Sequence, residues 1–131
     1  MRIHIISFLF FIISSIAIQT SVEKEILGKW QFVQASEIMQ KDGQEVSKNI
    51  EVKNLDDPFI KKDVILSFQA DNSIGFEIGD FIMYAKYTIK DSVLTIGKYK
   101  YGILKVTEDR LLLKTTTDSS QRIFQYKKRN L

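Results

Sequence analysis

The stretch that decides the fold is residues 64–106, which read VILSFQADNSIGFEIGDFIMYAKYTIKDSVLTIGKYKYGILKV. Apolar residues alternate with polar ones along most of it, and this is the period of a half-buried β-strand. Clusters of turn-forming residues interrupt the alternation at Asp71-Asn72-Ser73, at Gly79-Asp80 and at Lys90-Asp91-Ser92. Because links this short join antiparallel neighbours, the stretch predicts a β-meander.

The same rhythm extends in both directions from this stretch. The predicted strands number eight and cover residues 28–37, 64–70, 74–78, 83–90, 94–96, 99–106, 110–116 and 121–128. Eight meandering strands with one apolar face have open edges, and closure into a barrel removes them. We therefore expect an all-β fold, an antiparallel up-and-down eight-stranded barrel.

Two segments fall outside this pattern. Residues 38–63 begin with a hairpin signal at Asp42-Gly43, so the first strand can continue to Met39 and return through residues 44–47. The rest of that segment is loop-like, and long segments of this kind are lids, binding loops or mobile connections. Residues 21–27 can form a short helical turn that plugs one end of the barrel.

The N-terminus, residues 1–19, has the three-part pattern of a secretory signal peptide. Arg2 supplies the positive charge, and an apolar run extends from Ile5 to Ile18. This run is shorter than the roughly 20 residues that a membrane-spanning helix needs, although an uncleaved anchor is the alternative. We expect cleavage after Ala17 or after Gln19, and a mature domain of residues 20–131 in the periplasm or outside the cell.

Residue types limit the chemistry of that domain. The chain has no Cys and one His, and this His4 lies in the predicted signal peptide. The lack of Cys excludes a disulfide scaffold, a lipoprotein and a Cys nucleophile. Without His or Cys, the mature protein has neither a Ser-His-Asp triad nor an ordinary zinc site. We expect a protein that is not an enzyme and that has no metal and no cofactor.

The charged residues suggest no further site. Asp56-Asp57 and Glu108-Asp109 are neighbours in predicted turns, whereas hydrolytic acid–base work needs two carboxyl groups that converge from different environments. The net charge is +3, and Lys127-Lys128-Arg129 is the one basic cluster. We interpret the cluster as a solvated strand end, with attraction to an anionic envelope surface as the alternative, and we expect no nucleic-acid partner.

A family resemblance appears at the first predicted strand. Gly28-Lys29-Trp30 matches the G-x-W motif of lipocalins. The later pattern resembles compact lipocalin-like proteins exported by Bacteroidetes-type bacteria, in residues 68–71, 87–91, 94–96 and 107–111. The likeness covers about residues 24–128. The chain departs from animal lipocalins because it is shorter, has no Cys pair, and has Asp109 where their later motif has an aromatic residue.

The resemblance implies that Trp30 packs across the base of the barrel and that a late basic residue covers it. The first and last strands of a closed barrel are neighbours, so the start of one lies beside the end of the other. Arg129 is therefore the geometric candidate for a cation–π contact with the indole, with Lys127 and Arg122 as alternatives. The resemblance also implies binding of a small hydrophobic molecule.

The apolar face of the predicted strands is rich in aromatic residues. One interpretation is a ligand cavity, in which tyrosine hydroxyls orient a polar group. Its predicted lining is Phe32, Phe68, Phe76, Met83, Tyr87 and Tyr101. The other interpretation is a barrel that side chains fill, because eight strands leave room for either arrangement. The alternative function is that of a protein-binding or inhibitor module of the cell envelope, which acts through residues 38–63. We expect the protein to be a monomer.

Overall fold

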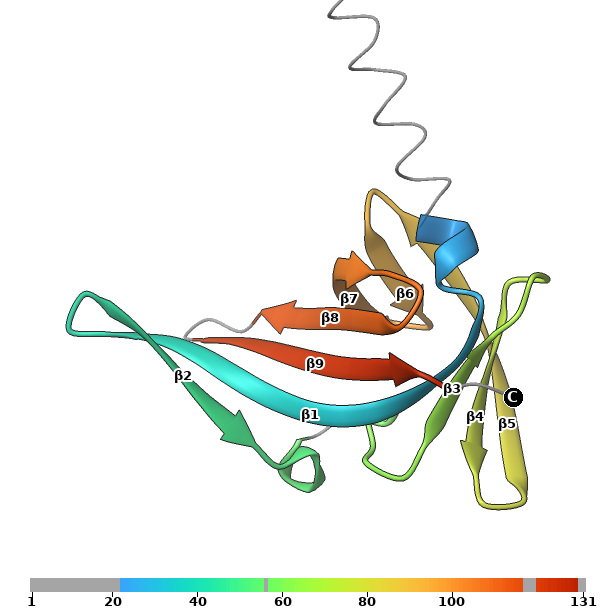
Figure 1. The fold of residues 1–131 in the computed structure, drawn as a ribbon, viewed down its shortest axis with the longest axis horizontal. Coiled ribbons are helices and arrows are strands. Elements are labelled where there is room, and N and C mark those ends of the chain that lie inside the picture. The colour runs from blue at the N-terminus through green and yellow to red at the C-terminus, as the bar shows by residue number, and fades with distance from the viewer. Residues whose placement is uncertain (1–21, 56, 117–119, 130–131) are drawn as a thin grey trace, which may run out of the picture.

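The strands of the computed structural model form one antiparallel sheet that closes on itself (Figure 1). The structure describes residues 22–55, 57–116 and 120–129, so the predicted signal peptide lies outside the described residues. The strands are β1 (Gly28–Lys41), β2 (Gln44–Ile50), β3 (Ile65–Phe68), β4 (Ser73–Ile78), β5 (Phe81–Lys90), β6 (Val93–Ile96), β7 (Tyr99–Val106), β8 (Arg110–Thr116) and β9 (Ser120–Lys128). Eight of them, β1 and β3 to β9, make the barrel, which confirms the predicted fold class.

Closure depends on β1, which pairs on both of its edges. One edge runs antiparallel to β9 from Trp30 to Met39, with an irregularity between Phe32 and Gln34. The other edge pairs first with β3 and then, from Ala35 onward, with β2. Because a bulge bends its strand, β1 can follow the barrel at one end and leave it at the other. Figure 1 shows β1 and β2 projecting together past the barrel.

The strand β2 is a ninth strand outside the barrel, and the hairpin signal that predicts it is local. Asp42 has φ +53 and Gly43 has φ +76, and the two residues join paired Lys41 and Gln44. A two-residue loop with both central residues at positive φ matches the twist of the strands that it connects. The hairpin prediction is therefore confirmed, and both strands are longer than expected.

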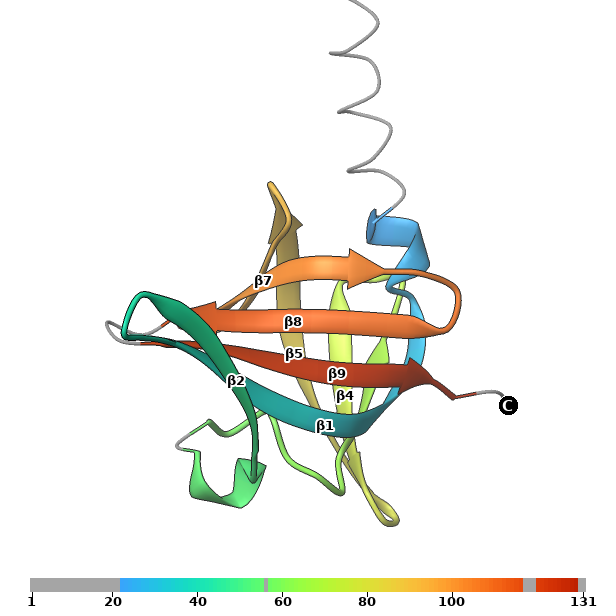
Figure 2. The ribbon, with the colours of Figure 1, turned by 60° about the vertical axis from the view of Figure 1, so that its left-hand side comes forward.

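Two short helical segments lie at opposite ends of the barrel, as Figures 1 and 2 both show. At one end, residues 22–25 form a helical turn, and the Ile26 side chain that follows it is fully buried. This end is called the plug end, and the predicted plug is confirmed. At the other end, the mouth, the 3-10 turn η1 (Val52–Asn54) leads into residues 55–63. Val52 and Ile60 are buried there.

One continuous core fills the space between the two ends. Its buried members are mainly the inward residues of the barrel strands, and aromatic rings supply much of its volume: Trp30, Phe68, Phe76, Tyr87, Tyr101, Phe124 and Tyr126. Among the described residues, no helix has the length and apolar character needed to span a bilayer.

Trp30 anchors the plug end. Its side chain is fully buried, and its indole N–H donates a hydrogen bond of 2.8 Å to the carbonyl of Ile26. The Lys128 ammonium lies 4.5 Å from the centroid of the indole ring and donates to the carbonyl of Leu27. Burial lowers the pKa of Lys128. One tryptophan and one lysine thus tie the N-terminal turn to the first and last strands of the barrel.

The prediction that Arg129 covers Trp30 is therefore wrong by one residue. Trp30 pairs directly with Lys128 in the sheet, and directly paired residues share a face. The next residue faces the opposite way. Arg129 is exposed, and its backbone N–H donates to the carbonyl of Lys29. The alternative Arg122 forms an ion pair with Glu37 instead.

Gly28 leaves the room that Lys128 needs. Its φ is +116, a conformation that side-chain-bearing residues rarely adopt. A Cβ at this position would lie 2.7 Å from the Nζ and 2.8 Å from the Cε of Lys128. The glycine of the G-x-W motif therefore serves the contact between lysine and tryptophan as well as the backbone.

We predict that Gly28→Ala lowers the free energy of unfolding by about 3 kcal/mol, because backbone strain and displacement of Lys128 add together. Gly97→Ala is the matched control, since Gly97 also has positive φ (+60) but a Cβ there meets open space. We expect a loss of about 1 kcal/mol for this control. Urea denaturation of both variants measures the difference, and equal losses would show that Lys128 does not require Gly28.

Candidate functional site

The six residues predicted to line a cavity do not lie together. Phe68 and Tyr87 lie toward the plug end, where their rings meet edge to face with centroids 5.1 Å apart. Phe76 and Tyr101 lie toward the mouth, where both contact residues 57–59. Phe32 meets Tyr126 edge to face, with ring centroids 5.7 Å apart. The six residues therefore do not line one cavity, and each end of the barrel is a candidate site.

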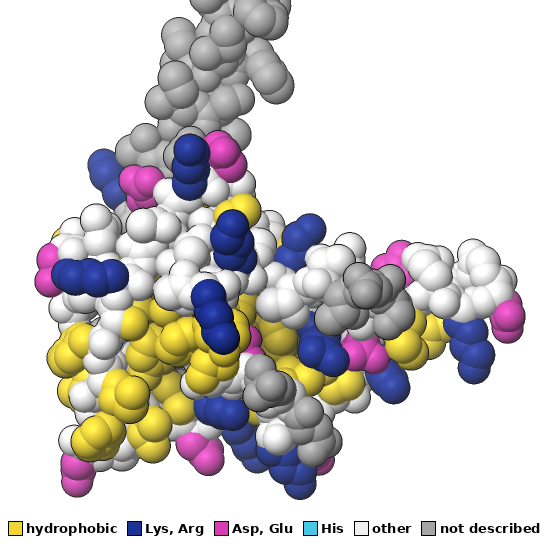
Figure 3. Space-filling model, turned by 180° about the vertical axis from the view of Figure 1, so that it is seen from behind, with side chains coloured by type: hydrophobic (Ala, Val, Ile, Leu, Met, Phe, Trp, Pro, Cys, Tyr) yellow, Lys and Arg dark blue, Asp and Glu magenta, His cyan; other side chains and the backbone are white. Residues whose placement is uncertain are grey.

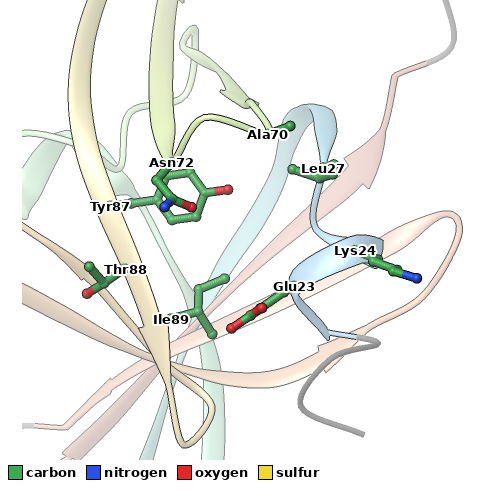
Figure 4. Close-up of a pocket in the computed structure, with 8 residues that line it drawn as sticks. All are labelled: Glu23, Lys24, Leu27, Ala70, Asn72, Tyr87, Thr88 and Ile89. Carbon is green, nitrogen blue, oxygen red and sulfur yellow. The ribbon is translucent and has the colours of Figure 1, made fainter. Parts of the chain in front are cut away.

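The plug end has a surface cleft of about 430 Å³ beside Tyr87 (Figure 4). The cleft lies between the helical turn, the link from β3 to β4, and β5, and its lining is Glu23, Lys24, Leu27, Ala70, Asn72, Tyr87, Thr88 and Ile89. The Tyr87 hydroxyl donates to the carbonyl of Gln69 at 3.1 Å. Burial raises the pKa of Tyr87, and Asp71 and Glu23 raise it further. Since this hydroxyl already has a partner, hydrogen bonds to a ligand in the cleft would come from other polar residues that line it, such as Asn72 and Thr88.

The mouth is closed by residues 57–60, which Asp57 ties together and to the barrel wall through hydrogen bonds. Its Oδ1 accepts from the backbone N–H of Phe59 at 2.8 Å and of Ile60 at 3.1 Å, so the carboxylate holds its own turn together. Both oxygens also accept from the Tyr101 hydroxyl, at 3.0 and 2.9 Å. The turn that the sequence predicts at Asp57 is therefore present, and it is also tied to the barrel wall.

The Phe59 ring fills the apolar part of the mouth. It stacks on Phe76, with centroids 4.8 Å apart and planes 24° apart. It also meets Tyr99 edge to face, with centroids 5.3 Å apart. Such aromatic pairs add about 0.5–1.5 kcal/mol beyond the burial of their surface. Residues 57–60 thus enter the mouth with one carboxylate and one ring, while the outer surface of Pro58 stays exposed.

Tyr126 has a buried hydroxyl for which the described residues offer no hydrogen-bond partner. The side chain is fully buried, and burial, followed by the charge of Asp57, raises the pKa of this hydroxyl. Burial, followed by the charge of Asp57, also raises the pKa of Tyr101. Tyr101 and Asp57 are thus in direct contact, and Tyr126 adds to the interior a second buried hydroxyl that has no partner among the described residues. An unpaired buried donor of this kind costs about 1–3 kcal/mol.

Met83 does not line the interior, contrary to the prediction. Its side chain is 55% exposed, because β6 pairs with β5 only from Tyr87 to Lys90 and leaves the first half of β5 uncovered on that side. Met83 belongs to a group of exposed apolar residues on β4 and β5: Ile78, Phe81, Ile82, Met83 and Tyr84. Figure 3 shows apolar side chains gathered on this face of the molecule.

Sequence reasoning missed two residues of the mouth, and it did not foresee that the Tyr126 hydroxyl lacks a partner among the described residues. Asp57 and Phe59 carry turn and loop signals, and the sequence holds no sign of which strand they contact. Tyr126 stands in a strand whose inward face is correctly predicted, but an unpaired hydroxyl is a property of the packed interior alone. Within the described ranges, no cluster of three or more His, Cys, Asp or Glu side chains could hold a metal ion.

Comparisons with known proteins add no relative. No family model matches the chain, and no curated protein or solved structure matches it either. The closed eight-stranded antiparallel barrel is compatible with a lipocalin-like fold.

We predict that Tyr101 and Tyr126 respond in opposite ways to loss of the hydroxyl. Tyr126→Phe raises the free energy of unfolding by about 1 kcal/mol, because it removes an unpaired buried donor. Tyr101→Phe lowers it by about 2 kcal/mol, because the carboxylate of Asp57 loses its partner on the barrel wall. Denaturant unfolding at neutral pH measures both. A loss of stability in Tyr126→Phe would mean that the hydroxyl has a partner in solution.

Proposed function

We propose that this protein binds a small hydrophobic molecule at the mouth of its barrel and catalyses no reaction. The observation that supports this most directly is the buried Tyr126 hydroxyl, which has no partner among the described residues. A ligand that carries a hydrogen-bond acceptor would satisfy that donor and offset its desolvation. The aromatic residues around the mouth would bury the rest of the ligand.

Access to this site requires residues 57–60 to move. Their contact with the wall is the bond between Asp57 and Tyr101 together with the packing of Phe59 and Ile60. Among the described residues, no backbone hydrogen bond of a strand holds them, whereas every barrel strand is paired along both edges over part of its length. Opening of this segment is therefore a smaller change than opening of the barrel wall.

We further propose that the protein is exported and belongs with the small bacterial lipocalin-like proteins. The n-region charge, the apolar run and the small residues before position 18 support a cleaved signal peptide. The G-x-W motif supports the family, because Gly28 and Trp30 meet Lys128 at the base of the barrel. A periplasmic or secreted monomer follows from this proposal.

The binding proposal predicts that the fluorescent dye prodan, a neutral naphthalene with one carbonyl, binds to the folded protein. Tyr126→Phe should weaken this binding about fivefold through loss of one hydrogen bond, although the variant is the more stable protein. Tyr84→Phe, at an exposed tyrosine, is the matched control and should leave the affinity unchanged.

Native mass spectrometry of the protein purified from its own host is the complementary measurement. We expect the folded protein to carry an additional small-molecule mass and to lack residues 1–17 or 1–19, according to the cleavage site used. A bare polypeptide mass together with no binding of prodan would contradict the binding proposal. A mass that includes residues 1–19 would contradict the proposed cleavage alone.

A second candidate function is protein binding through the β1–β2 arm, which consists of residues 38–50. The strand β2 pairs with β1 alone, so its other edge is open among the described residues. An open edge of this kind accepts an additional strand from a partner. The sequence predicts residues 38–63 as the surface that contacts a protein partner. The structure narrows this surface to the arm, because Val52 and Ile60 are buried in the mouth.

Val46→Asp tests this second candidate. Val46 is 39% exposed on the arm, and Ile82, which is 44% exposed on β5, provides the matched variant Ile82→Asp. If an envelope protein adds a strand to the arm, capture of that protein from host extracts falls at least fivefold for Val46→Asp only, because a buried unpaired charge is costly. Equal capture by both variants and the wild type would refute it.

A further inference from the structure

We propose that residues 57–60 are a built-in occupant of the mouth, and that the external ligand is a carboxylic acid carrying an aromatic ring. This inference rests on the proposed binding function and specifies the class of ligand. The chain itself shows which groups the mouth accepts, because one carboxylate and one ring of the segment already fill it. A ligand that replaces the segment must therefore place a carboxylate where Asp57 lies and a ring where Phe59 lies.

The polar position fits a carboxylate. Tyr101 donates to both oxygens of Asp57, and each of these contacts is about 3 Å long. Tyr126 provides a second buried hydroxyl, which has no partner among the described residues. When the segment leaves, Asp57 leaves with it, so the incoming group meets the Tyr101 hydroxyl and no longer faces that negative charge. Hydrogen bonds to an ionised acceptor are about twice as strong as those between neutral groups.

The apolar position fits a ring. Phe59 stacks on Phe76 and meets Tyr99 edge to face, so the slot has one flat wall and one perpendicular wall. A linear alkyl chain would fill the same volume but would lose both aromatic pairings. The ring and the carboxylate belong to residues two positions apart in the chain, which sets a separation that a short flexible linker can span.

The segment and the ligand then compete for one site. The ligand binds only those molecules in which the segment is out of the mouth. Its apparent affinity is therefore its intrinsic affinity multiplied by the fraction of such molecules. Any change that weakens the hold of the segment without altering the wall should therefore strengthen binding. This behaviour separates a built-in occupant from a lid, because a lid that closes over the ligand would contribute to binding.

The probes are 5-phenylvalerate and its primary amide, which differ only in the acidic group. Each is titrated into the wild-type protein by calorimetry and tested for displacement of prodan. We expect the acid to bind at least fivefold more tightly than the amide. In Asp57→Ala the acid should bind about tenfold more tightly than in the wild type. Asp63→Ala, at an exposed aspartate beyond the occupant segment, is the matched control and should leave binding unchanged.

Two further variants are included so that the test does not depend on the folding of Asp57→Ala alone. Phe59→Ala empties the ring position and should strengthen binding of both probes. Tyr101→Phe removes the donor on the wall, so it should weaken binding of the acid relative to the amide. Circular dichroism confirms that each variant is folded before titration.

Limited digestion with trypsin provides a readout that does not depend on affinity. Lys61 and Lys62 are exposed at the end of the segment, whereas Lys41 and Lys48 lie on the β1–β2 arm. We expect saturating 5-phenylvalerate to accelerate cleavage at Lys61 and Lys62, because it drives the segment out of the mouth. Cleavage on the arm should not change.

The possible failures are distinguishable. If neither prodan nor the two probes bind any folded variant, the proposed function itself is wrong. If prodan binds but the acid has no advantage over the amide, the carboxylate class is wrong. If Asp57→Ala and Phe59→Ala bind the acid more weakly than the wild type, or if the acid protects Lys61 and Lys62 from trypsin, the segment is a lid and the built-in occupant is refuted.

Discussion

The pairing of β1 with β9 is the constraint on which the rest of the structure depends. It converts a meander with two open edges into a closed wall, and its register decides which side chains meet inside. Trp30 pairs with Lys128 and Phe32 pairs with Tyr126, so both the base of the barrel and the unpaired hydroxyl follow from one alignment. A shift of one residue would turn all of these side chains to the opposite face.

The two ends of the barrel are closed by different kinds of interaction. At the plug end, the helical turn is tied to the wall by the indole of Trp30 and the ammonium of Lys128, which both bind backbone carbonyls. At the mouth, a segment is tied to the wall through the side chains of Asp57 and Phe59. Backbone carbonyls cannot be exchanged for a ligand, whereas a carboxylate and a ring can. This difference supports the mouth as the site of the proposed binding.

Strand alternation and turn chemistry are local, and for this reason the sequence predicts the barrel well. The bounds predicted for residues 99–106 and 110–116 coincide with β7 and β8. What sequence reasoning misses is decided at long range. The sequence places the predicted partner of Trp30 one position too late, because the register between β1 and β9 depends on a bulge in β1. The contact between Tyr101 and Asp57 joins residues 44 positions apart, and no periodicity encodes it.

The long separation in sequence between β1 and β9 has a consequence for how the protein reaches its folded state. During synthesis, every hairpin from β3 to β8 can form as soon as its two strands exist, but β1 must wait until β9 has been made. Contacts across such long separations in sequence slow folding. Until then β1 would have a bare edge, and its local hairpin with β2 protects half of the other one. The unfinished barrel is therefore exposed to association with other unfinished chains along the bare edge of β1 until β9 is made.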